Sequence, residues 1–285
     1  MIQKTKEESE NKQTYHRILK STTIIGGSSV VNVFFKAIQS KIVALLIGPS
    51  GVGLMGLLNS VLSLSSTVSG MGLSTSGVRE IAVANETGNE VKISKTITAF
   101  NRMAWFFGTV GTLVLYLSRN LVSQITFGTE QYASAIGILS IALFLTVISY
   151  AQFTLLRGMS HVGDLARINI YSVIIGSIFG IAIIYIWRLK GVVAFIFLTA
   201  LTRFGFSWFY SKKINFKKFK LSFEKLLAES RQLLTLGAGF MVSGLTTIGS
   251  TYLIKMMITR RLGLDATGLF EASSQLSNVY IGFIL

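Results

Sequence analysis

Long apolar runs separated by short polar intervals dominate the chain. About 20 helical residues cross a hydrocarbon core of ~30 Å. A membrane β-barrel would instead alternate polar and apolar positions over about ten residues. The pattern therefore predicts an all-α integral membrane protein, a multi-span helical bundle. The predicted spans are Ser21–Ile47, Leu54–Ser76, Ala104–Leu117, Ala133–Leu156, Ile168–Ile186, Val192–Tyr210, Leu233–Ile258 and Thr267–Leu285, the third extending toward Asn101 or Leu121.

Composition agrees with a membrane protein. Hydrophobic residues make up 51% of the chain and charged residues only 14%, whereas a soluble domain has about 25% charged residues. The chain has no cysteine, which excludes disulfide and thiol chemistry. The first 20 residues are polar and mixed in charge, unlike a cleavable signal peptide.

The net charge of +15 raises the question of nucleic-acid binding. The basic residues, however, lie between the apolar runs, where they act as topology signals, so we expect no nucleic-acid partner. Counting Lys and Arg in alternate intervals gives 18 on the N-terminal side of the membrane and five on the other. Positive charge favours the cytoplasmic side, which predicts a cytoplasmic N-terminus.

The sequence contains an internal repeat with an offset of 215 residues. Both copies are glycine-containing turns between two apolar runs, and parallel repeats of this kind are a known transporter architecture. The offset pairs Gly48 with Gly263, Gly53 with Gly268 and Leu54 with Leu269.

The repeat divides the chain into units. We expect a cytoplasmic segment over residues 1–20, a six-span bundle over 21–210, and the first two spans of a second bundle over 233–285. Because the last apolar run meets the chain end, a truncated second bundle is expected, with about four further spans needed to complete it. Residues 211–232 form a basic amphipathic linker, predicted to lie on the cytoplasmic membrane surface.

Several motifs resemble those of a known family. The stretch Gly48–Leu54, followed by Gly70–Leu73 and then Gly77–Glu80, resembles the O-antigen translocases. These are polysaccharide flippases of the multidrug/oligosaccharidyl-lipid/polysaccharide exporter superfamily. Tyr252–Lys255 with Gly268–Ala272 resembles the start of their second half, and residues 163–191 resemble their fourth-to-fifth span region.

The resemblance implies an activity. Members of this family flip an undecaprenyl-pyrophosphate-linked oligosaccharide, the O-antigen unit, from the cytoplasmic to the periplasmic leaflet of the bacterial inner membrane. Two six-helix bundles surround a central cavity and work by alternating access. The resemblance also implies a glycan polymerase and chain-length machinery as partners, and no cofactor. With the expected truncation, this chain would depart from the family pattern in its second bundle.

Four basic residues fall inside predicted spans: Lys36, Lys41, Arg203 and Lys255. A charge at the bilayer centre costs about 2.5–3.5 kcal/mol on insertion scales, so it normally faces a partner or a wet cavity. Lys36 and Arg203 are mid-span. Lys41 and Lys255 lie nearer the periplasmic ends, where snorkelling to the interface is an alternative.

These positions predict a cationic, substrate-binding cavity. Helical spacing places Asn32 on one polar stripe with Lys36, and Asn59 on another with Ser63 and Ser66. Such a cavity would attract the pyrophosphate and acidic sugars of a lipid-linked glycan. The deep acidic residue is Glu271, a candidate for proton or sodium coupling. The full predicted set is Lys36, Arg203, Lys41, Lys255, Asn32 and Asn59 for substrate, with Glu271 for ion coupling.

Other functions stay open. Another exporter of the superfamily, a lipid II flippase or a multidrug antiporter, is the nearest alternative, although an exporter of cations should carry the opposite cavity charge. A membrane polymerase or glycosyltransferase needs positioned acids, bases or metal ligands. The longest interval on the periplasmic side, Ser118–Tyr132, leaves little room for them. We therefore expect no catalytic residues and no metal site, with His16 and His161 solvated. A channel is not expected, because the sequence shows no charged ring and no filter-like loop.

Overall fold

A computed structural model describes residues 2–214 and 223–284, with side chains for most of 23–214 and for 234–277. Every described element is helical, which confirms the predicted all-α helical bundle. The elements are α1 (Ile2–Gly70), α2 (Leu73–Glu86), α3 (Glu90–Leu117), α4 (Arg119–Phe127), α5 (Ala133–Gly158), α6 (Val162–Trp187), the short 3₁₀ helix η1 (Arg188–Lys190), α7 (Gly191–Ser211) and α8 (Phe223–Ile284).

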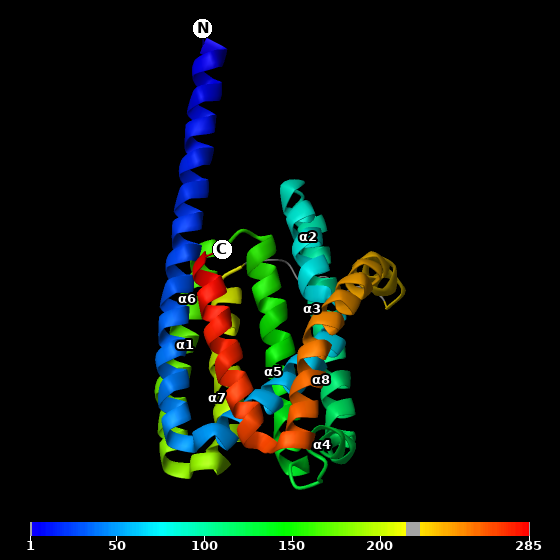
Figure 1. Ribbon diagram of the computed structural model, residues 1–285. Coiled ribbons are helices and arrows are strands. Elements are labelled where there is room, and N and C mark those ends of the chain that lie inside the picture. Colours follow the sequence, from blue (N-terminus) through cyan, green and yellow to red (C-terminus); the bar gives the residue numbers. More distant parts are fainter. Residues whose placement is uncertain (1, 215–222, 285) are drawn as a thin grey trace.

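Helices α1 and α8 each consist of two legs joined by a sharp turn at a glycine (Figure 1). Gly48 has φ 68° and ψ −177°, and Gly263 has φ 87° and ψ 177°. Residues with a Cβ rarely adopt positive φ, whereas glycine does so readily. The two positions paired by the 215-residue repeat therefore share one unusual backbone conformation.

Three described stretches are long and apolar enough to cross a membrane: Gly26–Gly70, Ala133–Gly158 and Val162–Ser211. The first has 45 residues and the third 50, about twice the length that one crossing requires. Gly48 divides the first and η1 divides the third, so each accounts for two predicted runs.

Some boundaries differ from the sequence prediction. The run predicted over Leu54–Ser76 is broken at Met71 and Gly72, which have φ of 46° and 64°, and its last residues belong to α2. Helix α1 begins at Ile2, so residues 2–20 of the predicted cytoplasmic segment are helical. Most of the predicted linker, 211–232, lies outside the residues whose side chains are described.

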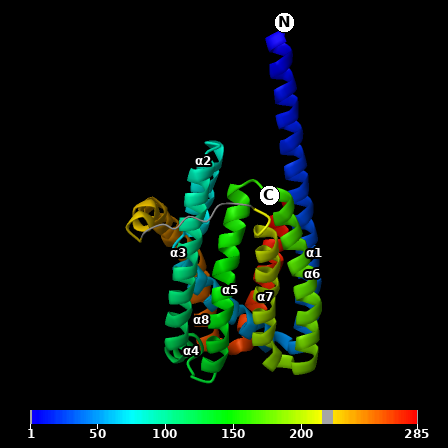
Figure 2. The same cartoon turned by 180° about the vertical axis from the view of Figure 1, so that it is seen from behind.

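Helix α5 is the central element of the bundle. Its residues belong to both apolar clusters, packing with Leu58 and Val192 in one and with Ile97 and Phe100 in the other. Figure 2 shows α3, α5, α7 and α6 side by side, with α5 and α7 between the other two. Many large apolar side chains remain exposed on the outside, including Leu45, Leu117 and Ile186, as expected for a surface that faces lipid.

The turns separate into two groups at opposite ends of the bundle. The glycine turns of α1 and α8, α4 and η1 lie at the lower end in Figure 1. The α2–α3 and α5–α6 turns lie toward the upper end, beyond which the first leg of α1 projects. This arrangement brings the glycine turns of the two kinked helices together at one end of the bundle. Helix α8 also contacts α2 and α3.

Candidate functional site

The two kinked helices contact one another through paired glycines. A Cβ on Gly53 would overlap the carbonyl oxygen of Leu264, and a Cβ on Gly268 would overlap that of Pro49. The offset of 215 converts Gly53 into Gly268 and Pro49 into Leu264. The two contacts are therefore equivalent, and α1 and α8 meet about a local pseudo-twofold axis.

A polar network crosses this axis a little further from the turns. Lys255 Nζ lies 2.7 Å from Glu271 Oε2 and donates to Ser60 Oγ at 3.1 Å. Gln275 Nε2 donates to Glu271 Oε1 at 3.0 Å, and Ser40 Oγ donates to Gln275 Oε1 at 2.5 Å. The ionic side chains are only 10% and 14% exposed, for Lys255 and Glu271 respectively. The network joins both legs of α1 to both legs of α8.

The same offset relates the members of this network. It converts Ser40 into Lys255 and Ser60 into Gln275, so the hydrogen bonds from Ser40 to Gln275 and from Lys255 to Ser60 are equivalent. It also converts Gly56 into Glu271, and a Cβ on Gly56 would lie 2.8 Å from Glu271 Oε2. The second repeat thus places an ion pair where the first has a serine and a glycine.

This geometry gives Lys255 a partner that the sequence analysis did not assign to it. It does not snorkel to an interface, because only 8% of the residue is exposed, and it does not offer a free cation, because Glu271 neutralises it. A sequence signal was available: Lys255 and Glu271 each lie eight residues from Gly263. Positions equidistant from the turn of a helical hairpin lie at the same depth, so the two charges could have been paired.

Lys36 of α1 and Arg203 of α7 form a second charged feature. Arg203 Cζ lies 4.8 Å from the ring centroid of Phe153 and 5.4 Å from that of Tyr150, both on α5. Lys36 is exposed, and it lies within electrostatic range of Arg203. Within the described residues neither cation has a carboxylate within 4 Å, and the buried Nε of Arg203 has no acceptor. The fold therefore brings these two predicted residues within electrostatic range of each other, and we refer to them as the cationic pair.

The other predicted residues are not gathered at this pair. Lys41 is exposed on the first leg of α1. Asn32 donates to Ser28 O of its own helix at 3.3 Å, and Asn59 is half-buried on the second leg. Among the described residues none of the three bonds to Lys36 or Arg203.

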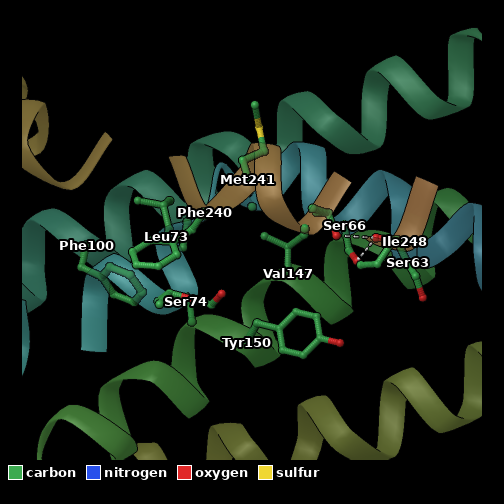
Figure 3. A pocket seen from close by; sticks show the side chains of 17 residues that line it. Ser63, Ser66, Leu73, Ser74, Phe100, Val147, Tyr150, Phe240, Met241 and Ile248 are labelled. Carbon is green, nitrogen blue, oxygen red and sulfur yellow. Dashed lines mark hydrogen bonds between the residues drawn. The ribbon is translucent and has the colours of Figure 1, made fainter. Parts of the chain in front are cut away.

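A pocket of about 320 Å³ lies between the second leg of α1, the start of α2, α3, α5 and the first leg of α8 (Figure 3). Every lining residue is uncharged, and six of them carry hydroxyl groups. The aromatic rings of Phe100, Phe240 and Tyr150 form part of its wall. Tyr150 is also the ring against which Arg203 lies, so the pocket and the cationic pair share one side chain. The hydroxyl-bearing residues are Ser63, Ser66, Thr67, Ser74, Thr75 and Tyr150.

Close backbone packing positions α8 against the turn that borders the pocket. A Cβ on Gly72 would overlap the carbonyl oxygen of Gly237, so only glycine permits this approach. The sequence indicated Ser63 and Ser66 as a polar stripe but gave no sign of the pocket. Its α8 residues, Phe240 and Met241 among them, are apolar and carry no local signal of a site.

Comparison with known proteins supports a transporter fold. Residues 18–285 match a family described as polysaccharide biosynthesis protein. The chain is 23% identical over 274 residues to the Lipid III flippases of Escherichia coli (strain K12) and Shigella flexneri, covering 94% of this chain and 64% of each relative. The chain thus spans a little less than two thirds of the length of these curated relatives.

Solved structures show the same architecture. An inward-facing multidrug resistance MATE family transporter of the MOP superfamily superposes with a TM-score of 0.67 at 14% identity, over 87% of this chain and 58% of that one. A MOP superfamily transporter from Pyrococcus furiosus is described as having a binding pocket of reverse polarity. It superposes with a TM-score of 0.55 at 15% identity, over 92% of this chain and 65% of that one. At these identities the likeness establishes the fold alone.

Proposed function

This chain belongs to the polysaccharide biosynthesis protein family, and from that membership we propose that it flips a lipid-linked oligosaccharide between the leaflets of the bacterial inner membrane. The substrate would be an undecaprenyl-pyrophosphate-linked unit such as the O-antigen unit, moved to the periplasmic leaflet by alternating access. The flippase relatives and the MOP-type fold support transport. The glycan polymerase and chain-length machinery would act as partners on the product.

The observation that carries this proposal is the cationic pair of Lys36 and Arg203. A charge among membrane helices is costly unless it has a partner or water, and the described residues supply neither cation with a carboxylate. An anion 4 Å from either charge would gain about 4 kcal/mol at an effective dielectric constant of 20. A lipid pyrophosphate carries such charge, and its tail can stay in the bilayer.

A multidrug antiporter is the competing transporter class. Binding of cationic compounds is favoured by an accessible carboxylate in the interior. Glu271 is the interior acid at the α1–α8 contact, and Lys255 already neutralises it at 2.7 Å. The charge pattern therefore favours an anionic substrate. A lipid II or lipid III type of substrate shares the lipid pyrophosphate and fits the same site.

The charges at the two ends of the bundle support one orientation in the membrane. The end with the glycine turns carries Arg119, Arg188 and Arg260 with few other basic residues, whereas most of the lysines and arginines lie toward the opposite end. We place the glycine-turn end in the periplasm and the N-terminus in the cytoplasm by the positive-inside rule. Residues 21–210 would then be the first transport unit and 233–285 the start of the second.

Export in cells that depend on this chain tests the proposal. Lys36→Ala and Arg203→Ala should each abolish glycan export while protein levels in the membrane hold, because each removes half of the pair that binds the anion. Arg119→Ala is the matched control, since Arg119 also stacks on a tyrosine, 4.6 Å from the Tyr116 centroid, but lies at the α3–α4 turn. Normal export by both site variants would remove the pair from the mechanism.

A further inference from the structure

The pocket between α1, α2, α3, α5 and α8 differs in chemistry from the cationic pair. None of its lining residues is charged, and its volume of about 320 Å³ is at the lower end of the ~300–1,000 Å³ typical of small-molecule sites. A bound cation would lack a carboxylate there, and a bound anion would lack a positive partner within the lining. The pocket therefore suits a small neutral group.

The pocket also offers hydrogen bonds. Within the described part of the chain, the hydroxyls of Ser63, Ser74, Thr75 and Tyr150 have no hydrogen-bond partner, and Figure 3 shows Ser74 and Tyr150 on the same side of the opening. Ser66 and Thr67 donate to Ser63 O, both at 2.9 Å, which leaves their oxygen lone pairs free to accept. Filling the pocket with an acyl chain would leave these groups without partners, which is unfavourable.

Hydroxyl groups beside aromatic rings are the surroundings that a sugar ring requires. Sugar hydroxyls donate and accept hydrogen bonds, while the C–H faces of the ring pack against aromatic side chains such as Phe240 and Tyr150. Tyr150 also contacts Arg203, so a ligand in the pocket lies next to the cationic pair. A pyrophosphate at Lys36 and Arg203 would place its first sugars toward this pocket.

We propose that this pocket is a binding subsite for a neutral sugar of the lipid-linked oligosaccharide. The proposal rests on the transport function proposed above and adds a separate element of specificity. The cationic pair binds the lipid pyrophosphate whatever it carries, and the pocket distinguishes a glycosylated lipid from a bare one.

A glycine on the rim permits a direct test. Gly70 lines the pocket, and a Cβ placed on it meets no atom within 4 Å, so Gly70→Leu directs a side chain into the free space. Gly26→Leu is the matched control, because Gly26 is exposed on α1 and its Cβ also meets nothing. A triple variant, Ser63→Ala, Ser74→Ala and Thr75→Val, removes three of the six lining hydroxyls with almost no change in volume. It tests sugar binding in the pocket even if Gly70→Leu does not fold.

The measurement is binding to the purified chain in nanodiscs of two probes: a polyprenyl pyrophosphate bearing one N-acetylhexosamine, and the same lipid without sugar. We expect the native chain to prefer the glycosylated probe, and Gly70→Leu and the triple variant to weaken its binding about tenfold, the effect of ~1.4 kcal/mol. Binding of the bare lipid should not change. Equal binding of both probes, or a preference that survives in both variants, would overturn the subsite and leave the transport proposal standing. Failure of the native chain to bind either probe would instead refute the transport proposal.

Discussion

The ion pair between Lys255 and Glu271 predicts a specific pattern of stability changes. The two charged atoms are 2.7 Å apart and both side chains are largely buried, so their mutual attraction is about 6 kcal/mol at an effective dielectric constant of 20. Burial costs a similar amount, because both ions lose hydration. Lys255→Met should therefore destabilise the protein by about 3–5 kcal/mol, not because the pair is strongly stabilising but because Glu271 is left buried without a counter-charge.

Thermal unfolding in detergent, followed by tryptophan fluorescence, measures the effect. At roughly 2–4 °C per kcal/mol for a chain of this size, Lys255→Met should lower the melting temperature by roughly 6–20 °C. The double variant with Glu271→Met should return close to the native value, since replacing both charges by apolar groups is often neutral or stabilising. Lys41→Met, an exposed lysine of α1, is the control and should change stability by less than about 0.5 kcal/mol.

The comparison between the single and double variants shows whether the loss of stability comes from the unpaired carboxylate of Glu271. If Lys255→Met alone leaves the melting temperature within about 1 °C of the native value, the pair is not buried as described. If the double variant is no more stable than the single one, the loss comes from packing at Lys255 and not from an uncompensated carboxylate.

Two further predictions concern the same helices. Gly268→Ala should lower the melting temperature by the equivalent of at least about 2 kcal/mol, because its methyl group would overlap the Pro49 carbonyl; Gly26→Ala serves as the reference, and equal stability of the two variants would contradict the close contact. Glu271→Gln should reduce export that is driven by an imposed proton or sodium gradient in vesicles, if this carboxylate couples transport to an ion. An export rate that is unchanged across a range of gradients would remove Glu271 from coupling.

Apolar runs in the sequence located the three described stretches that are long and apolar enough to cross a membrane, because length and composition alone determine what can cross a bilayer. They placed the first turn near Gly48, and the 215-residue offset led to Gly263, which has the same backbone conformation. The break at Met71 was missed because the predicted run was continued to Ser76. Gly70 and Gly72 flank Met71, and glycine readily adopts the positive φ that Gly72 has.

Side-chain partners were harder to predict than helices. Helical spacing gave the face on which Lys36 lies but not that α7 would bring Arg203 beside it, because the choice of neighbouring helix depends on packing across the whole bundle. The partner of Lys255 was not predicted for a related reason: depth along a span was considered without the turn that brings Glu271 back to the same level. The pocket could not be predicted from the sequence, because about half of its wall consists of apolar residues that do not differ from those of the core.

The ion pair at the pseudo-twofold contact affects how readily α1 and α8 can be parted. An apolar seal of the same size would lose its whole hydrophobic stabilisation on exposure to water, with nothing gained in return. Lys255 and Glu271 instead recover their hydration when water reaches them, which offsets much of the lost attraction. Because the equivalent positions of the first repeat are Ser40 and Gly56, only one side of the axis provides this compensation. The junction thus combines tight backbone contact with a small net energy difference between its joined and hydrated forms, the combination that a reversible seal requires.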